Sequence, residues 1–402
     1  MKHQFAYTIH FEDQNGKILN LAKESASVYN QAIDVFWQNL DNDKFLSKFD
    51  VQEQIDIPRK LLHSQSYQGS IQLAHTAIST YFSSLKEYKK NSNPFSGKPR
   101  APKEHKNVQM IIFKKSAIRY KENYLLLSTK EEPLKFRWNI DKGLPIYATI
   151  TWNKESGWQL NLILEKEQDI HEFVSNRLMA IDLGIKRIAT LFDEEKVITI
   201  SGKIIMSLNR LRNKINAQTR AKLDRLDKHS RQYKKVRRAN RRVVKRIKNK
   251  IKDILHKYSR TIVNHCIAND IGKIVVGDCS DIHNETNLGK KNNQKIQQNP
   301  EQRLLKYIKD KFEVIGGVVE TTPEAYTSKT CPLCGNVLKR SPAGRIFRCQ
   351  CSFEYDRDGV GAINIHKKVS FDQLDWLNVV GGLTPPIGLK FKPNRDCLAH
   401  GS

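Results

Sequence analysis

The sequence predicts an α/β fold joined to a small β-barrel, and three observations support this class. Residues 108–165 contain several short apolar or alternating runs separated by turn residues, which is typical of strands. The segment from residue 176 alternates strand-like runs with helical patterns, as α/β domains do. The first part of the chain opens with one strand-like run, QFAYTIHF, and then follows helical periodicity. With 402 residues, the chain is long enough for two or three domains.

The N-terminal part is predicted to be a barrel interrupted by helices. Residues 19–40 and 70–90 both have apolar side chains at helical spacing. The first of these helices would bury Leu21, Val28, Ala32 and Phe36. The segment NSNPFSGKPRAPKEHKN is a loop or boundary, because it is dense in Pro, Gly and Lys. We expect the opening strand to join the later strands across the helices, so residues 1–11 and 106–170 are assigned to the barrel and 12–105 to a helical insert.

From residue 176, the predicted element order is that of a ribonuclease-H-like α/β domain. Three strands come first, in RLMAIDL, KRIATLF and KVITISG, and a long helical stretch follows. KIVVGD is a fourth strand, EQRLLKYIKDKF a helix, EVIGGVVETTPEA a fifth strand and GVGAINIHKKV the last helix. We assign residues 176–328 and 354–370 to this domain, with 205–268 as a basic helical insertion, 329–353 as a separate small module and 371–402 as an irregular tail.

The charge balance favours a polyanionic partner. Lys and Arg number 69 against 42 Asp and Glu, which gives a formal net charge of +27. Each cation that neutralises a phosphate releases a counterion, so nucleic acid is the expected partner. No apolar run is long enough to span a bilayer, and the opening residues lack the apolar core of a secretory signal. We therefore expect a cytoplasmic protein with no membrane partner.

The basic charge is concentrated in one predicted helix, over residues 232–260. Its apolar side chains lie close to one face, and the other faces are almost wholly Lys and Arg. Such a run is often only a solvated face. Acidic partners four residues away are nearly absent here, so the cations repel one another unless an anion lies alongside. The candidate phosphate contacts are Lys234, Lys235, Arg237, Arg238, Arg241, Arg242, Lys245 and Arg246.

Four of the seven cysteines are close together in the sequence. Cys331 and Cys334 form a C-x2-C pair, and Cys349 and Cys351 form a tighter C-x-C pair. Four soft ligands suit tetrahedral Zn²⁺, and no His or open water position suggests a catalytic metal. We predict a structural zinc ribbon over residues 329–353. The other three cysteines, Cys266, Cys279 and Cys397, are expected to be small buried apolar residues.

Two acids occupy positions where a ribonuclease-H-like sheet presents catalytic carboxylates. Asp182 ends the first strand, in AIDLG, and Asp358 stands at the start of the last helix, in DRDGVGAINI. A third acid is expected from the end of the neighbouring fourth strand. Three such carboxylates would hold two Mg²⁺ ions for phosphodiester hydrolysis. Taken singly, an Asp such as Asp182 in IDLG is more often a turn or cap residue, and Asp358 is explained as a cap of the last helix. Only the joint pattern favours the catalytic interpretation.

The motifs IDLGIKRIA, EAYTSKTCPLCGN and CSFEYDRDGVGAINI resemble the signatures of TnpB proteins. These are transposon-encoded RNA-guided DNA endonucleases of the OrfB transposase type, related to type V CRISPR effectors. The resemblance covers residues from about Asn176 to Lys368. The earlier part is similar only in layout, with GKPRAPK resembling the family's lysine-rich stretch before the barrel strands.

This resemblance implies a RuvC-like nuclease split by the zinc ribbon, preceded by a wedge-type barrel that carries a helical recognition insert. It implies structural zinc, catalytic magnesium, a guide RNA from the element's own end, a short flanking DNA motif and a double-stranded target DNA. Asp182 matches the family's first catalytic acid and Asp358 the third, with Asp356 as the alternative third acid. We expect a prokaryotic, nucleoid-associated protein that acts as a monomer on RNA, although no sequence feature decides the oligomeric state.

The second acid departs from the family pattern, because Gly277 stands where many relatives have Glu. Asp278 is one candidate, but a shift of one residue along a strand turns a side chain to the opposite face. Glu324, at the end of the fifth strand, is the candidate we favour, because that strand lies beside the fourth in this fold. We therefore predict Asp182, Glu324 and Asp358 as the catalytic, magnesium-binding set. A site without nuclease activity is the third possibility.

Three functions are consistent with the sequence. The first is an RNA-guided, Mg²⁺-dependent DNA endonuclease, which we favour. The second is an RNA-guided DNA-binding repressor without nuclease activity, which Gly277 keeps open. The third is a transposase that uses the same fold for strand transfer, with a DNA hydroxyl in place of water as the nucleophile.

Overall fold

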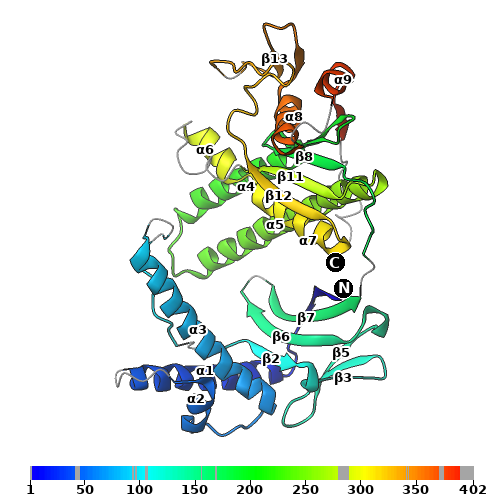
Figure 1. Cartoon of the computed structure of the whole chain (residues 1–402). Helices are drawn as coiled ribbons and strands as arrows, with labels where there is room; N and C mark the ends of the chain where they lie inside the picture. Colours follow the sequence, from blue (N-terminus) through cyan, green and yellow to red (C-terminus); the bar gives the residue numbers. More distant parts are fainter. Residues whose placement is uncertain are drawn as a thin grey trace. The chain divides into compact units, whose positions relative to one another are not determined.

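The structure is a computed structural model, and it divides into two compact units, Met1–Glu167 and Gln168–Ser402 (Figure 1). The residues described are 2–40, 46–92, 95, 97–104, 107–154, 156–167, 170–278, 289–340, 342, 344–370 and 375–389. Within these residues, no helix is long and apolar enough to cross a membrane.

The described residues of the first unit form two small sheets and three α-helices. Its strands are β1 (Lys2–Phe11), β2 (Ile111–Lys114), β3 (Ile118–Lys121), β4 (Tyr124–Leu127), β5 (Leu134–Arg137), β6 (Pro145–Asn153) and β7 (Gly157–Glu167). They form a four-stranded sheet in the order β1-β7-β6-β2 and a three-stranded sheet in the order β3-β4-β5. β1 pairs antiparallel with β7 along its whole length, so the predicted pairing of the opening strand across the helices is confirmed. Closure of the two sheets into a barrel stays a prediction.

The helices of this unit are α1 (Lys17–Leu40), α2 (Lys48–Gln54) and α3 (Ser64–Lys90). The predicted apolar face of α1 is buried, as Leu21, Val28, Ala32 and Phe36 show. α1 crosses α3 closely, because small residues meet there: the hydroxyls of Ser25 and Ser70 lie 2.8 Å apart.

The second unit is built on a six-stranded sheet in the order β12-β11-β8-β9-β10-β15. The strands are β8 (Leu178–Leu183), β9 (Arg187–Phe192), β10 (Val197–Ser201), β11 (Lys273–Asp278), β12 (Val318–Pro323) and β15 (Ile387–Leu389). β8, β9 and β10 run antiparallel, while β11 is parallel to β8 and β12 is parallel to β11. The fourth predicted strand therefore lies beside the first and the fifth beside the fourth, as expected for the ribonuclease-H-like order.

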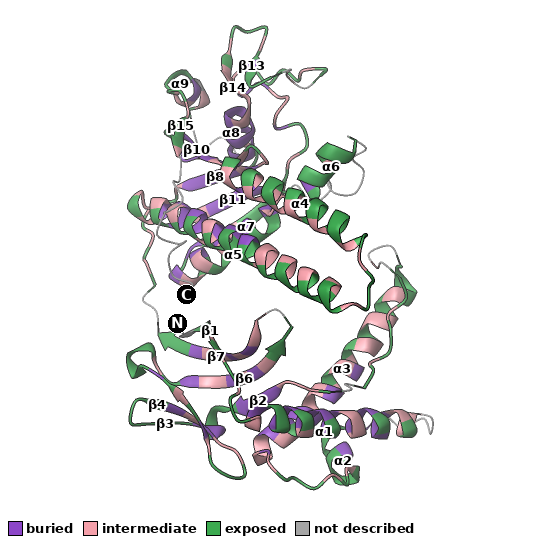
Figure 2. Cartoon of the chain, turned by 180° about the vertical axis from the view of Figure 1, so that it is seen from behind, coloured by how far each residue is buried: buried purple, intermediate pink, exposed green. Residues whose placement is uncertain are grey.

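Helices cover both faces of this sheet. The helices of this unit are α4 (Lys203–Leu223), α5 (Arg231–Ala268), α6 (Lys290–Gln297), α7 (Glu301–Phe312), α8 (Arg357–Ser370) and α9 (Trp376–Gly381), of which α5 and α7 pack on one face of the sheet and α8 on the other. Met179 and Ile181 of β8 belong to the core with α5 and α7, whereas Leu178 and Ala180 pack against Ile365 of α8. Since side chains alternate along a strand, Asp182 points to the same face as Ala180, toward α8. The buried strands β8 and β11 are visible in Figure 2.

The basic helical segment differs in part from the predicted insertion over 205–268. It is two helices, α4 and α5, and the second half of α5 is core rather than insertion, because Ile251, Leu255, Ile262 and Cys266 are buried against the sheet. Exposed cations are concentrated in α4 and the first half of α5, and the second half of α5 has fewer, Lys252, Lys257 and Arg260 among them. The predicted burial of Cys266 is confirmed, whereas Cys279 and Cys397 lie outside the described residues.

The tail from 371 was expected to be irregular, and this prediction is wrong for two short elements. α9 forms at Trp376–Gly381, and β15 pairs in parallel with β10, with Ile198 opposite Ile387. The indole of Trp376 lies against Phe192 and His366, at ring-centroid distances of 6.4 and 5.6 Å. A free edge of β10 and an apolar cluster under the tail thus order residues whose own Gly and Pro content indicated only turns.

Candidate carboxylate site and cysteine cluster

The three predicted catalytic acids come together from three elements of the second unit. Asp182 lies near the end of β8, Glu324 follows β12 directly, and Asp358 is in the first turn of α8. All three line one cavity of about 640 Å³, called here the carboxylate cavity. The strand order brings the carboxyl ends of β8, β11 and β12 to the same edge, and the start of α8 closes that edge.

The acids share this cavity with cations and hydroxyls. Its other described lining residues are Gly184, Ile185, Lys186, Arg187, Thr190, Thr327, Ser328, Gly344, Arg345 and Arg357. The carboxylate of Asp358 lies 3.4 Å from Arg187, 3.6 Å from Arg357 and 3.8 Å from Arg345, measured between oxygen and guanidinium nitrogen. Sequence analysis did not identify these arginines. Arg187 and Arg345 come from other segments that only the fold brings to Asp358, whereas Arg357 directly precedes it in the chain.

The electrostatics of Asp182 reflect crowding of like charges. Burial raises the pKa of its carboxyl well above the usual value, and the nearby carboxylates of Glu324 and Asp358 raise it further, whereas Arg357 opposes the shift. A carboxyl group held in this way favours either a proton or a nearby cation. The cavity therefore has the donor type and the charge deficit of a divalent-cation site.

Gly277 explains how the chain accommodates Glu324. A Cβ atom placed on Gly277 would lie 2.5 Å from Cγ and 2.7 Å from Cδ of Glu324, closer than real side chains approach. The side chain of Glu324 thus covers the position from which the family pattern expects the second acid. β12 lies beside β11, with Gly277 opposite Thr322. Glu324 is two residues beyond Thr322, and its side chain extends across the neighbouring strand to Gly277.

A second glycine makes room for Asp182. A Cβ atom on Gly361 of α8 would collide with Oδ2 of Asp182 and would lie 3.2 Å from its Cγ. The absence of a side chain at Gly361 allows α8 to pass directly over the end of β8. The small-residue run GVGA was the sequence signal for this close approach, although its spacing alone does not identify the partner.

The two alternative acids occupy different environments. One carboxylate oxygen of Asp356 accepts hydrogen bonds from the backbone N–H groups of Asp358 and Gly359, both at 3.1 Å, and Asp356 also pairs with Arg187. Asp356 is therefore the residue that caps α8, the role considered as the alternative for Asp358. Asp278 is exposed at the end of β11 and is not among the described residues that line the carboxylate cavity.

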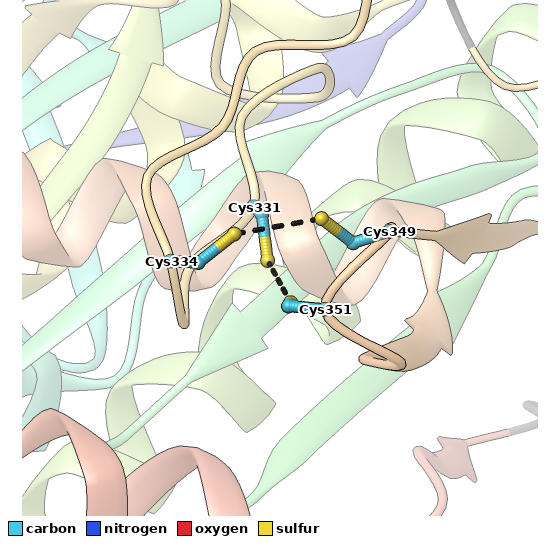
Figure 3. Close-up of side chains that lie close together, drawn as sticks. All are labelled: Cys331, Cys334, Cys349 and Cys351. Atoms are coloured by element: carbon cyan, nitrogen blue, oxygen red, sulfur yellow. Dashed lines mark hydrogen bonds between the residues drawn. The ribbon is translucent and has the colours of Figure 1, made fainter.

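The four predicted zinc ligands also come together (Figure 3). One donor atom from each of Cys331, Cys334, Cys349 and Cys351 lies within 4.8 Å of the others. Two tight turns hold the pairs: the N–H of Gly335 donates to the carbonyl of Cys331 at 3.0 Å, and that of Ser352 to Cys349 at 3.1 Å. Four free thiols in this arrangement match the ligand set of a closed structural zinc site.

The cysteine cluster is joined to the carboxylate cavity through α8. The cluster lies between β12 and α8 and includes a small hairpin, β13 (Ile346–Arg348) and β14 (Glu354–Asp356). The amide of Asn364 on α8 donates to the carbonyls of Thr327 and Thr330, both at 2.7 Å, and Lys367 donates to that of Pro332 at 2.9 Å. The same helix thus carries Asp358 and fixes the segment between Glu324 and the first cysteine pair.

The eight candidate phosphate contacts lie on the first half of α5. Lys234, Lys235, Arg237, Arg238, Arg242 and Arg246 are exposed, and Arg241 and Lys245 are half-buried. Within the described part of the chain, none of the eight forms an ion pair with an acid, whereas Lys257 further along α5 pairs with Asp253 at 2.8 Å. This surface therefore offers uncompensated positive charge.

Comparisons with known proteins agree with this architecture. Residues 162–283 match the family model OrfB_IS605, described as "Probable transposase", and residues 302–365 match the model "Cas12f1-like, TNB domain". The first match includes β8 to β11, and the second runs from α7 into α8 and includes all four cysteines.

The relatives include one TnpB-like protein and several solved RNA-guided nucleases. The chain is 29% identical to the TnpB-like protein MJ0751 of Methanocaldococcus jannaschii over 196 residues, which cover 48% of this chain and 68% of that protein. The fold of this chain is similar to that of the solved Cas12f1–sgRNA–target DNA complex. The TM-score is 0.56 at 15% identity, over 88% of this chain and 83% of that chain. The fold is similar also to that of the mini-RNA-guided endonuclease CRISPR-Cas_phi3, with a TM-score of 0.54 at 11% identity over 91% and 92% of the two chains. The chain is therefore similar to TnpB-like proteins and shares the fold of Cas12 effectors.

Proposed function

We propose that the chain is a transposon-encoded, RNA-guided and Mg²⁺-dependent DNA endonuclease. The observation that carries this proposal is the convergence of Asp182, Glu324 and Asp358 from three elements in one cavity. Such a set suits hydrolysis of a phosphodiester bond, where negative charge must be neutralised at the reacting phosphate. The donor set fits magnesium, because carboxylate oxygens are its preferred protein ligands and the raised pKa of Asp182 marks a shortage of positive charge.

The residues of the chain have separate tasks in this proposal. Asp182, Glu324 and Asp358 would hold the metal, which when bound activates a water molecule and stabilises the leaving oxygen. Arg187, Arg345 and Arg357, held near Asp358, would bind the phosphates of the strand and keep it in the cavity. Gly277 and Gly361 admit the side chains of Glu324 and Asp182 to their positions.

The nucleic-acid partners are proposed from the surface charge and from the relatives. The eight cations on α5 would contact phosphates of a guide RNA or its duplex with target DNA without reading sequence. The solved Cas12f1 structure is itself a complex with a guide RNA and a target DNA. We propose likewise that the first unit is the wedge-type barrel with its recognition insert, that residues 329–353 bind structural zinc, and that the guide RNA comes from the element's own end.

The test is cleavage of target DNA by the full chain, purified together with its own RNA, with and without Mg²⁺. The parent is compared with Glu324→Gln, which removes one carboxylate charge, and with Asp278→Asn as the matched control at the exposed acid. We expect cutting by the parent and by the control, and a loss of about a hundred-fold or more for Glu324→Gln. Equal cutting by Glu324→Gln and the parent would remove Glu324 from the site.

The same assay separates the two other functions. RNA-dependent DNA binding with no cleavage by the parent would identify a repressor. Joined DNA products, instead of free ends, would identify strand transfer. The geometry favours the nuclease over the repressor, because Glu324 supplies a carboxylate beside Gly277.

A further inference from the structure

A second cavity, of about 700 Å³, adjoins the carboxylate cavity, and Ile185 lines both. Ile185 stands in the turn between β8 and β9, so this turn forms the boundary between the two spaces. The turn is held from the other side: the side-chain amide of Asn299 donates to the carbonyl of Gly184 at 3.3 Å and to the carboxylate of Glu301 at 2.7 Å. The two cavities are thus neighbouring parts of one supported surface.

The lining of this second cavity, called here the amide pocket, has three chemical parts. Ile185, Ile188, Ile205 and Met206 supply an apolar surface. Five amide side chains follow, from Asn209, Asn213, Gln294, Gln298 and Asn299. Four cations, Arg210, Lys214, Lys291 and Lys295, complete the lining together with the hydroxyl of Ser207. No acid is among its described lining residues.

The amides are positioned by one another. Asn213 and Gln298 exchange two side-chain hydrogen bonds, at 3.2 and 3.1 Å, and the amide of Asn209 donates to the backbone carbonyl of Gln298 at 3.2 Å. These bonds tie α4 to the segment after α6. Each amide carries two donors and an acceptor with two lone pairs, so bonding capacity remains for a ligand.

These parts match a nucleotide better than they match a peptide or a lipid. An apolar surface suits the face of a base, amide donors and acceptors suit its polar edge, and exposed Lys and Arg suit the phosphates beside it. A base stacked and paired in a duplex cannot enter such a pocket, whereas a base of a single strand can. A strand with one phosphate at the carboxylates must also continue beyond the cavity.

We propose that the amide pocket binds a base of the single-stranded DNA next to the phosphate that is cut. This inference rests on the proposed function, because it assigns the pocket to the DNA strand that enters the carboxylate cavity. It adds a substrate subsite formed by α4, by the β8–β9 turn and by the segment from α6 to Asn299. Binding there would position the strand at a fixed distance from the three acids.

The test is photo-crosslinking without Mg²⁺, so that no cleavage is needed. The full chain with its co-purified RNA is mixed with a single-stranded oligonucleotide that contains 4-thiothymidine. Crosslinked peptides are then identified by mass spectrometry. The proposal predicts crosslinks in α4 between Met206 and Asn213. Met206→Trp should fill the pocket, abolish these crosslinks and weaken oligonucleotide binding about ten-fold, the value expected for one well-bound base.

Leu211→Trp is the matched control, because Leu211 lies on the same helix, is 46% exposed and does not line the pocket. It should leave crosslinking and affinity as in the parent. A second variant, Asn213→Leu with Gln298→Leu, removes the paired amides without adding bulk, and it should weaken binding in the same direction. If Met206→Trp does not fold, this double variant decides the question.

Two results would overturn the inference. One is crosslinks that lie elsewhere in a parent that cleaves its target normally in Mg²⁺. The other is crosslinking of this pocket by guide RNA that carries 4-thiouridine, with none from the DNA. By contrast, if the parent gives crosslinks in α4 but never cleaves DNA, the amide pocket binds the base as proposed and only the proposed nuclease activity is wrong.

Discussion

The carboxylate cavity and the cysteine cluster are both candidate metal sites, but the chain builds them in opposite ways. The cluster draws all its ligands from Cys331 to Cys351, and two tight turns bring them together. The cavity draws its three acids from positions as far apart as 182 and 358, and only the strand order β12-β11-β8 makes them neighbours. One site depends on local geometry, and the other depends on the complete fold.

The difference has a structural consequence, because α8 touches both sites. Asp358 begins this helix, Asn364 bonds to the carbonyls of Thr327 and Thr330, and Lys367 bonds to that of Pro332. The cysteine cluster therefore lies between Glu324 and Asp358 in the sequence, and it supports the segment that connects these two acids. A substitution in the cysteine cluster should therefore displace the catalytic acids and slow cleavage. A substitution of one acid should leave zinc binding by the cluster unchanged.

The largest expected effect is that of a substitution in the carboxylate cavity on DNA cleavage. Asp182→Asn removes one carboxylate charge while keeping the size of the side chain. We expect target cleavage to fall roughly 10³-fold, because a metal-binding charge at the reacting phosphate is lost. Zinc content and RNA-dependent DNA binding, measured on the same preparations, should stay at parent values. Parallel loss of binding would show that Asp182 is structural.

The second prediction concerns a substitution in the cysteine cluster. Replacing Cys331 and Cys334 together with Ser should release the zinc, because two of four thiolate ligands are lost, and should unfold the ribbon locally. Cleavage should fall about a hundred-fold, since the segment between Glu324 and α8 loses its support. Metal content by mass spectrometry and cleavage rate check the two effects. Lys339→Ser, at an exposed non-ligand position of the ribbon, is the control. A variant without zinc that cuts normally would separate the two sites.

A smaller effect is expected from Gly277→Ala, whose new Cβ atom would push Glu324 from its place. We expect cleavage about ten-fold slower, because the displaced carboxylate still remains near the cavity. The sharper test is exchange: Gly277→Glu combined with Glu324→Ala should cut faster than Gly277→Glu alone, where two acids compete for one space. Gly381→Ala is the matched control, since a Cβ atom there meets nothing within 4 Å. If the combined variant is slower than both single changes, the two positions are not equivalent.

The sequence was sufficient for the local features of both sites. The four cysteines and the order of strands and helices follow from spacing and periodicity, because each depends on residues near one another in the chain. The choice of Asp182 and Asp358 rests on the joint pattern of the motifs and on the family resemblance, and their catalytic role stays a prediction. The choice of Glu324 needed one more step, the placement of the fifth strand beside the fourth, and its role stays a prediction.

The remaining features could not be predicted, because they depend on contacts between distant segments. Arg187 and Arg345 become neighbours of Asp358 only when the sheet and the ribbon are both in place. β15 joins the sheet because the edge of β10 is available, and nothing in its own Gly-rich surroundings indicates a strand. The second half of α5 proved to be core, because its apolar face packs against the sheet, and the sequence pattern shows such a face without showing its partner.

The smallest expected effect concerns stability, and it compares the two buried carboxyls Asp182 and Asp193. Asp193 follows β9 in the same sheet and is also buried, and burial alone would raise the pKa of its carboxyl. Hydrogen bonds from His265 at 2.8 Å and from the backbone N–H groups of Lys196 and Glu195 nevertheless lower it below the usual range. Two buried carboxyls of one sheet thus have opposite shifts, because one is surrounded by donors and the other by acids.

Asp193→Asn should therefore lower the free energy of unfolding at neutral pH by about 2 kcal/mol, the typical value of hydrogen bonds to a buried charge. A carboxyl with a lowered pKa stabilises the folded state fully above its unfolded pKa, near 4, and this stabilisation is lost as the pH falls through the folded pKa. The difference between parent and variant should be constant from about pH 8 to pH 5 and shrink below about pH 4. Asp182→Asn without added Mg²⁺ should act in the opposite direction and raise stability at neutral pH, because ionisation at a raised pKa opposes folding. Urea unfolding of both variants at several pH values measures the two effects. If both variants change the free energy of unfolding in the same direction, ionised Asp182 does not destabilise the folded state.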